Sequence, residues 1–222
     1  MKTTIKRSAI ATLLLLVFSL AGLAQKRTTQ ATLYRQFVPS TITLKDGRKL
    51  KQPLTNVFLK NSSLVYLKGE YTMEANMDNI AVVEFKDRKF ININNQLAYL
   101  VDSVGQNAVY RIDLFDMVSY KAQLRNNINI SNIEIGEMVS TTSVDLNNEE
   151  DYKFPVFPEF YFLYNGQYVK AHEREISRRL PKDGDLKRKY KTAIGMKNFS
   201  WTDETSLVVL LKAITPDSIK EP

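Results

Sequence analysis

Short segments of alternating apolar and polar residues, separated by turn residues, restrict the folds available to this chain. Residues 41–45 have this alternation and lead into Asp46-Gly47, a dipeptide that favours a two-residue hairpin turn. Similar segments follow at a spacing of about ten residues. They are 48–52, 56–60, 64–68, 79–85, 89–94, 97–102, 108–114 and 117–123. Such a series predicts an antiparallel β-sandwich or barrel.

The chain becomes more polar after this series. Residues 126–139 have an extended pattern, but asparagines and Gly136 interrupt it, so an edge strand or a covering loop is expected. Residues 140–151 end in the run NNEED, which predicts a solvated linker. A calcium site is the weaker interpretation, because the run lacks the glycine and closing glutamate of an EF-hand loop.

The C-terminal part predicts a hairpin followed by helices. Residues 160–164 and 167–172 flank Asn165-Gly166, and the first of these segments is apolar on both faces. Helices are expected at 173–180, at 185–194, and from an N-cap at Thr202 onward. In the last helix one apolar face contains Leu207, Leu210, Leu211 and Ile214. We therefore expect the hairpin to be buried between the β region and this helix.

The expected class is α+β: an antiparallel β-sandwich or barrel-like domain followed by a β-hairpin and two or three C-terminal helices. The expected boundaries are 1–24 for a signal peptide, 25–40 for an N-terminal extension, 41–146 for the β-rich domain, 147–158 for a linker, and 159–222 for the hairpin and helical tail.

The first 24 residues predict export. A basic start at residues 1–7 precedes an apolar run, and Gly22 and Ala24 have the spacing of small residues at a cleavage site. The run is shorter than the roughly 20 residues that a spanning helix needs, so cleavage after Ala24 is expected rather than an anchor. A bacterial lipoprotein needs a cysteine at the cleavage point, and the chain has none. The mature protein is expected in the periplasm or outside the cell, or associated with the outer membrane, without a transmembrane segment.

Composition excludes several chemistries. The absence of cysteine excludes disulfides, thiolate catalysis and cysteine metal sites. The single histidine, His172, excludes a zinc site made of several histidines, and no nucleophile-elbow motif accompanies it. Removal of residues 1–24 changes the net charge from +7 to +4, with 28 basic residues against 24 acidic ones. This excess is weaker than that of typical nucleic-acid-binding proteins, so we expect neither a nucleic-acid partner nor a cofactor.

The segment Thr43-Leu44-Lys45-Asp46-Gly47 and the tail 160–214 resemble exported, functionally uncharacterised proteins of the Bacteroidota. Those proteins combine a β-rich N-terminal region containing an L-x-DG hairpin with an aromatic strand, a turn of the form N/K-G, and closing helices. The matching tail features here are Tyr164-Asn165-Gly166-Gln167 and the LLKAI stretch. The resemblance covers most of the mature chain. It implies an envelope or secreted location and supplies no catalytic residues.

A basic region in the tail is one candidate binding surface. It would bind an anionic envelope component, such as lipid headgroups or an acidic polysaccharide, or an acidic partner protein. The alternative is the solvated face of two short amphipathic helices. The candidate ligand-binding residues are Arg174, Arg178, Arg179, Lys187, Arg188, Lys189 and Lys191.

Aromatic residues crowd the tail, where they would either stack on sugars or pack in a core. They are Tyr152, Phe154, Phe157, Phe160, Tyr161, Phe162, Tyr164, Tyr168, Tyr190, Phe199 and Trp201. The acidic pairs Asp113/Asp116 and Glu134/Glu137 are the remaining route to a glycosidase. Two Asp-Ser-aliphatic segments, at 102–104 and 217–219, match an O-glycosylation acceptor pattern.

These features favour an exported, non-catalytic binding or interaction module for a partner protein or an envelope component. The alternative is a carbohydrate-binding or carbohydrate-hydrolysing protein that uses exposed aromatic rings and carboxylates. A protein that is not an enzyme is therefore the favoured interpretation, and an enzyme is the alternative.

Overall fold

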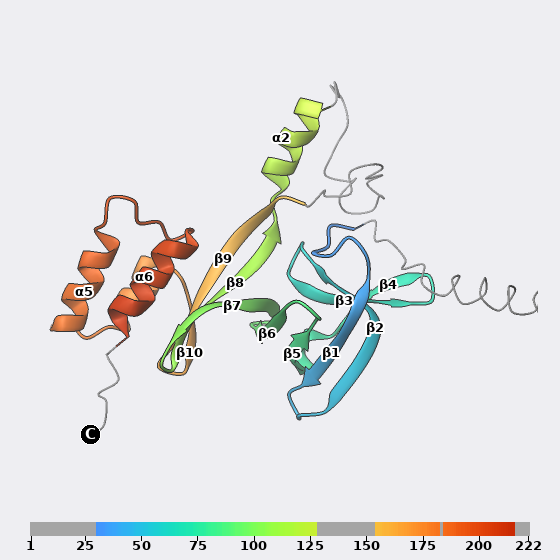
Figure 1. Cartoon of the computed structure of the whole chain (residues 1–222), viewed down its shortest axis with the longest axis horizontal. Coiled ribbons are helices and arrows are strands. Elements are labelled where there is room, and N and C mark those ends of the chain that lie inside the picture. The colour runs from blue at the N-terminus through green and yellow to red at the C-terminus, as the bar shows by residue number, and fades with distance from the viewer. Residues whose placement is uncertain (1–29, 128–153, 183, 216–222) are drawn as a thin grey trace, which may run out of the picture.

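The computed structural model describes residues 30–127, 154–182 and 184–215, and Figure 1 shows the arrangement. A ten-stranded antiparallel sheet in the order β10-β9-β8-β7-β6-β5-β1-β2-β3-β4 curls into a half-barrel. The strands are β1 (Val38–Leu44), β2 (Lys49–Phe58), β3 (Ser63–Lys68), β4 (Tyr71–Glu74), β5 (Ile80–Glu84), β6 (Lys89–Ile93), β7 (Gln96–Val104), β8 (Asn107–Phe115), β9 (Val156–Tyr164) and β10 (Gln167–Lys170). The predicted predominance of antiparallel strands is confirmed.

Four helices and one 3-10 turn accompany the sheet in the described part of the chain. They are η2 (Met77–Asn79), α2 (Met117–Asn127), α4 (Glu173–Ser177), α5 (Asp185–Ile194) and α6 (Glu204–Ile214). None of these helices is long and apolar enough to span a bilayer. The predicted signal peptide and the polar segment 140–151 lie outside the described residues, as does the predicted extended segment 126–139 from residue 128 onward.

The first hairpin forms at the predicted Asp46-Gly47 turn. Gly47 has a φ of 86°, a conformation that glycine adopts without strain, and its N–H donates to the Leu44 carbonyl over 2.9 Å. The prediction of separate strands at 48–52 and 56–60 is wrong, because β2 continues through Pro53. The pairing register with β1 shifts between Val38 and Ser40, opposite this proline, and β3 pairs with β2 from Thr55 onward. A bulge next to an unpaired edge tolerates a residue without an N–H.

The sheet curls until the β2–β3 turn meets β7 and β8. Leu97 N donates to Ser62 O over 2.7 Å, and Ser62 Oγ donates to Leu97 O over 2.8 Å. Phe115 N donates to Leu59 O over 2.8 Å. The curl encloses what we call the barrel core: Ile42, Val57, Leu64, Met77, Ile80, Val83, Phe85, Phe90 and Leu97, all buried.

Residues 117–123 are helical, so the strand predicted there is wrong. The carboxylate of Asp116 accepts hydrogen bonds from Ser119 N over 3.0 Å and from Ser119 Oγ over 2.7 Å. This is the side-chain cap of a helix start, and the alternation of residues 117–123 does not reveal it. The described chain resumes at residue 154, and β9 pairs with β8 from Phe115↔Val156 to Ala108↔Leu163. The sheet therefore begins again inside the segment 147–158 that was predicted as a linker.

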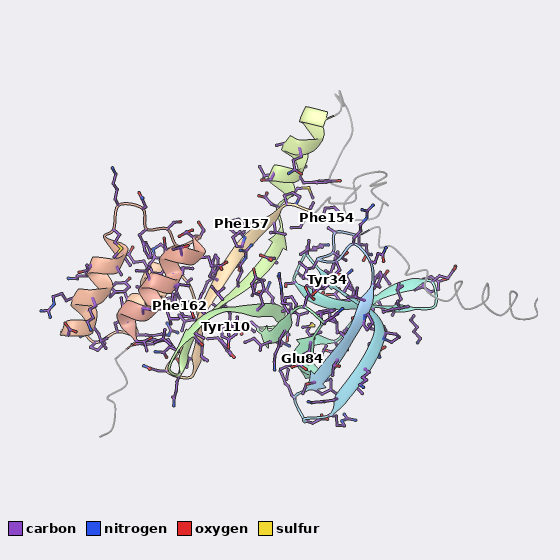
Figure 2. The ribbon with its side chains drawn as sticks, viewed as in Figure 1. Tyr34, Glu84, Tyr110, Phe154, Phe157 and Phe162 are labelled. Atoms are coloured by element: carbon purple, nitrogen blue, oxygen red, sulfur yellow. The ribbon has the colours of Figure 1, made fainter. Side chains whose placement is uncertain are left out.

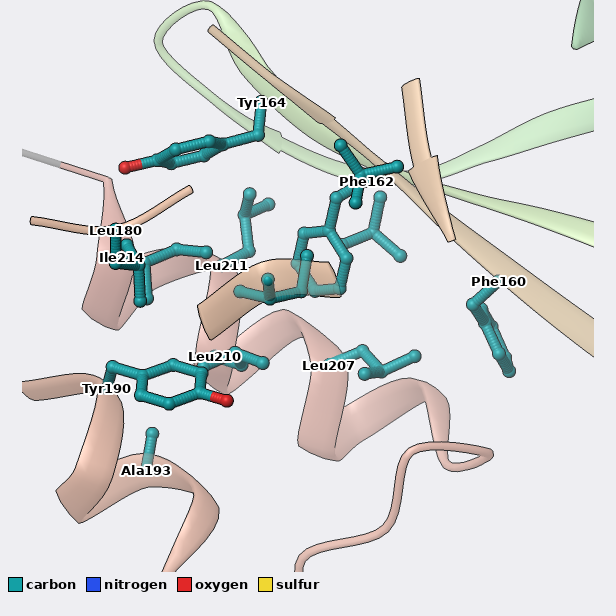
Figure 3. Packing of buried hydrophobic residues seen from close by; sticks show 13 residues of the cluster. Phe160, Phe162, Tyr164, Leu180, Tyr190, Ala193, Leu207, Leu210, Leu211 and Ile214 are labelled. Carbon is teal, nitrogen blue, oxygen red and sulfur yellow. The ribbon is translucent and has the colours of Figure 1, made fainter. Parts of the chain in front are cut away.

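The predicted tail hairpin forms at the expected turn, but β9 begins at Val156 rather than at residue 160, and β10 ends at Lys170 rather than at residue 172. The hairpin belongs to the ten-stranded sheet instead of following a separate β domain, and helices cover one face of it. Asn165 and Gly166 both have positive φ values, 49° and 77°, as a two-residue hairpin turn requires. Figure 3 shows the packing of what we call the helix core. Its buried members are Val109, Phe160, Phe162, Tyr164, Val169, Ile176, Leu180, Tyr190, Ala193, Leu207, Leu210, Leu211 and Ile214. The four apolar residues predicted on the last helix are thus buried against the hairpin.

Two helix ends differ from the predictions. The N-cap of α6 is Asp203 rather than Thr202, because the Asp203 carboxylate accepts from Ser206 N over 2.7 Å. Helix α4 ends at Ser177, before the predicted end at residue 180. Helix α5 has the predicted bounds, 185–194. The sequence periodicity therefore located these helices, while local capping chemistry set their ends.

Candidate binding pocket at the junction of two cores

A cavity of about 400 Å³ lies where the barrel meets the long strands β8 and β9. It is open to solvent, and Figure 2 labels two of the residues that line it, Tyr34 and Phe154. The full lining is Thr32, Leu33, Tyr34, Leu59, Asp87, Arg88, Tyr99, Arg111, Asp113, Phe154 and Val156. Four parts of the described chain thus form it: the segment before β1, the β2–β3 turn at Leu59, the β5–β6 turn with β7 and β8, and the start of β9.

One row of cross-strand neighbours explains this location. Phe90 pairs with Tyr99, Tyr99 with Arg111, and Arg111 with Phe160, so four neighbouring strands contribute to a single sheet face. Phe90 belongs to the barrel core and Phe160 to the helix core. The guanidinium carbon of Arg111 lies 5.9 Å from the Tyr99 ring centre and 6.0 Å from the Phe160 ring centre. A charged residue therefore separates two hydrophobic cores on the same face of one sheet.

Arg111 is held by two carboxylates. Its Nε lies 2.7 Å from Asp113 Oδ1, and its Nη1 lies 3.1 Å from Glu204 Oε2 on α6. Burial opposes the charged form of Arg111, but the hydrogen bond to Asp113 and its charge outweigh burial, and the pKa is raised. Arg111 is therefore a permanently charged link between β8 and α6, and its charge is already compensated.

The charge of Arg88, unlike that of Arg111, is not compensated by a carboxylate of the described residues. The β5–β6 turn at residues 86–88 places its guanidinium carbon 4.4 Å from the centre of the Tyr99 ring, within cation–π distance. In the described part of the chain, no carboxylate pairs with Arg88 and no acceptor takes a hydrogen bond from its guanidinium. Burial, followed by the nearby charge of Asp113, raises the pKa of Tyr99, so the ring stays neutral. Arg88 thus presents a positioned cation whose donors are available to a ligand.

Another wall of the cavity is built around Tyr34. Its hydroxyl donates to Asp87 Oδ1 over 2.7 Å, and its ring centre lies 4.9 Å from that of Phe85. Burial raises the pKa of Tyr34 above its ordinary value, and the hydrogen bond to Asp87 raises it further. The buried Asn56 fixes the backbone there, because it accepts from Tyr34 N over 3.0 Å and donates to Tyr34 O over 2.7 Å. This wall is consequently preorganised.

The basic residues proposed from the sequence lie elsewhere, on α4, on α5 and in the segment between them. Most are paired with acids nearby in sequence: Arg178 and Arg179 with Glu175, and Arg188 and Lys189 with Asp185. Lys187 Nζ donates to Ser177 Oγ over 2.8 Å and lies 5.2 Å from the Tyr190 ring centre. Arg174 and Lys191 are exposed. The structure does not bring these residues to the cavity.

Most tail aromatic rings pack inside the molecule. Phe160, Tyr161, Phe162, Tyr164 and Tyr190 are buried, and Phe199 and Trp201 pack partly buried against the helix core. Phe154 lines the cavity, and Phe157 and Tyr168 are exposed. Tyr152 lies outside the described residues.

The remaining sequence candidates are separated in the fold. Asp113 lies in the cavity, whereas Asp116 caps α2. His172 is the N-cap of α4, where its Nδ1 accepts from Arg174 N over 3.3 Å. Ser103 is exposed on β7. The pair Glu134/Glu137 and the segment 217–219 lie outside the described residues.

Sequence inspection did not identify Tyr34, Asp87, Arg88, Tyr99 or Arg111. One signal was available, because Arg111 and Asp113 alternate with apolar residues in the strand and follow Val109 on its inward face. Opposite charges at i and i+2 on a buried strand face indicate an internal ion pair. The described residues contain no cluster of three or more acidic or histidine side chains that would hold a metal ion. No protein-family model, curated protein sequence or solved structure matches this chain.

Proposed function

We propose that the chain is an exported, non-catalytic binding protein of the cell envelope, and that the junction cavity is its ligand site. The observation that carries this proposal is Arg88, a cation fixed on the Tyr99 ring at the cavity wall, with its guanidinium donors unused by the described residues. The cavity volume of about 400 Å³ falls in the usual range for small-ligand sites. Export rests on the basic and apolar pattern of residues 1–24 and on the resemblance to exported proteins.

The other polar groups of the cavity make contacts that favour binding over catalysis. Asp113 is engaged with Arg111, Asp87 with Tyr34, and the Thr32 hydroxyl with the Tyr34 carbonyl over 2.9 Å. These contacts hold side chains in fixed positions, as a binding site requires. None of them pairs a nucleophile with a base in the geometry of covalent catalysis.

The test is a ligand screen with matched variants. Protein 25–222 would be titrated with soluble glycans, sugar acids and short peptides, and binding would be followed by ligand-observed NMR. A genuine cavity ligand should bind the wild type and Arg48→Gln equally, and bind Arg88→Gln about tenfold more weakly. Arg48 is the control because it lies exposed in the first hairpin, paired with Asp46. If no ligand shows this dependence on Arg88, the cavity is not the binding site.

A further inference from the structure

We propose, on the basis of the proposed binding function, that the cavity binds a hexuronic acid unit, a sugar ring with one carboxylate. The carboxylate would pair with Arg88, the hydroxyl groups would donate to the acids of the cavity, and the ring would lie against the aromatic walls. Each part of this assignment follows from a different feature of the cavity: its charge balance, its unused acceptors and its rings.

The charged residues around the cavity favour a ligand with a single negative charge. Arg111 already faces Asp113 and Glu204, so it does not require a further anion. Arg88 has no carboxylate partner among the described residues and would take one. Asp87 and Asp113 also line the cavity, and they would repel a ligand with a second negative charge, such as a phosphate monoester. A monoanion therefore fits better than a dianion.

The unused acceptors select a ligand with hydroxyl donors. Asp87 accepts from Tyr34 through Oδ1, and Asp113 binds Arg111 through its own Oδ1. In the described structure, the second oxygen of each carboxylate takes no hydrogen bond. A carboxylate offers about four acceptor positions, so both acids have capacity for donors from a ligand. Sugar hydroxyls supply such donors without adding charge.

The rings select a ligand with an apolar face. Tyr34, Tyr99 and Phe154 line the cavity together with Leu33, Leu59 and Val156. A sugar ring has C–H groups on its faces and hydroxyl groups at its edge, which matches aromatic walls and peripheral acids. A simple carboxylate such as acetate would leave these walls without contact. The three features together describe an acidic sugar.

The test compares two probes that differ at one position. Methyl β-D-glucuronide has a carboxylate where methyl β-D-glucoside has CH2OH, and the pair of galacto isomers would be measured in parallel by NMR titration. We expect at least one uronide to bind about tenfold more tightly than its neutral counterpart, with binding weakened by added salt. Arg88→Gln should remove this preference, and Arg48→Gln should keep it.

The outcomes separate this inference from the proposed function. Equal binding of the neutral and acidic probes, or equal binding of acetate, would overturn the hexuronic acid assignment while leaving the cavity as the site. So would a peptide or phosphate ligand that depends on Arg88 when both uronides fail to bind. If no probe in the wider screen depends on Arg88, both proposals fail together.

Discussion

The barrel core and the helix core lie on the same face of one sheet but are closed in different ways. The barrel core is enclosed by the curl of the sheet, through contacts distant in sequence such as Ser62 with Leu97. The helix core is covered by α4, α5 and α6, which follow the hairpin directly in the chain. The cavity lies between the part of this face that the curled sheet encloses and the part that the helices cover. The candidate site is thus located where one continuous sheet passes from the barrel to the helix-covered region, with Arg111 at the boundary.

The largest effect should come from removing the last helix. Truncation after Lys197 deletes α6 and with it Leu207, Leu210, Leu211 and Ile214, all fully buried. Each such side chain stabilises the fold by about 1.5 to 3 kcal/mol, so the loss rivals the stability of a typical domain. The truncated protein should aggregate or be degraded, as size-exclusion chromatography and recovery of soluble protein would show.

The same truncation tests whether the two cores are one cooperative unit. A soluble monomer that keeps native circular dichroism and the wild-type melting temperature would show that α6 is not needed for the fold. Its apolar face would then be better interpreted as a docking surface.

A single substitution tests the packing of the helix core without deleting a helix. Leu210→Ala should lower the free energy of unfolding by about 2 to 5 kcal/mol, because the site lies in the middle of the helix core. Val209→Ala is the matched control: the neighbouring side chain is 37% exposed, and the change should cost much less. Urea unfolding followed by tryptophan fluorescence is suitable, because Trp201 packs against this core. Equal effects of the two substitutions would contradict the packing described.

The sequence predicted the helix core better than the barrel, for a physical reason. A helix stripe such as Leu207, Leu210 and Leu211 shows its buried face through local periodicity, and Asn165-Gly166 shows its turn through backbone conformation. Closure of the barrel depends on pairings between β1 and β5 and between the β2–β3 turn and β7, which no local pattern encodes. Most strands were therefore predictable, although β4 was missed and residues 117–123 are helical. The order in which the strands pair was not predictable.

The candidate site was hidden by the same limitation. Tyr34, Arg88 and Arg111 come from three distant segments, and each has an ordinary local setting: a loop, a turn and a strand. The basic residues of the tail attracted attention because they are close in sequence, yet most of them pair with acids nearby in sequence. Clusters in sequence are thus a weak guide to sites that the sheet topology assembles.

A smaller loss of stability is expected when the contacts that hold the cavity wall at Tyr34 are removed and the apolar barrel core is left unchanged. Asn56→Ala removes the amide that holds the Tyr34 backbone and also donates to Gln36 O over 3.1 Å. Because the partner groups become unsatisfied, we expect a loss of about 2 to 4 kcal/mol, together with weaker ligand binding. Asn198→Ala, at an exposed position near α6, is the control for a general effect of losing an amide. Unchanged stability of the Asn56 variant would mean that the segment before β1 is held by other contacts.

The smallest predicted effect is on the pH dependence of stability, and it concerns one tyrosine at the cavity and one in the helix core. Burial raises the pKa of Tyr34 at the cavity, and burial raises the pKa of Tyr190 in the helix core to about 12. Above pH 10, the unfolded chain releases these protons while the folded chain retains them, so the free energy of unfolding should fall as pH rises. Below pH 10 both phenols are protonated in both states, and this contribution is fully present.

Tyr34→Phe and Tyr190→Phe should each reduce the fall in stability above pH 10, as measured by urea unfolding at a series of pH values. Tyr34→Phe also removes the donor to Asp87, so its stability at neutral pH should be lower by about 1 kcal/mol. Tyr190 has a weaker hydrogen bond, 3.3 Å to the Glu173 carbonyl, so its replacement should matter less at neutral pH. If instead the Tyr190 substitution alone flattens the alkaline profile, the Tyr34 hydroxyl is open to water, and the cavity wall is looser than the barrel that supports it.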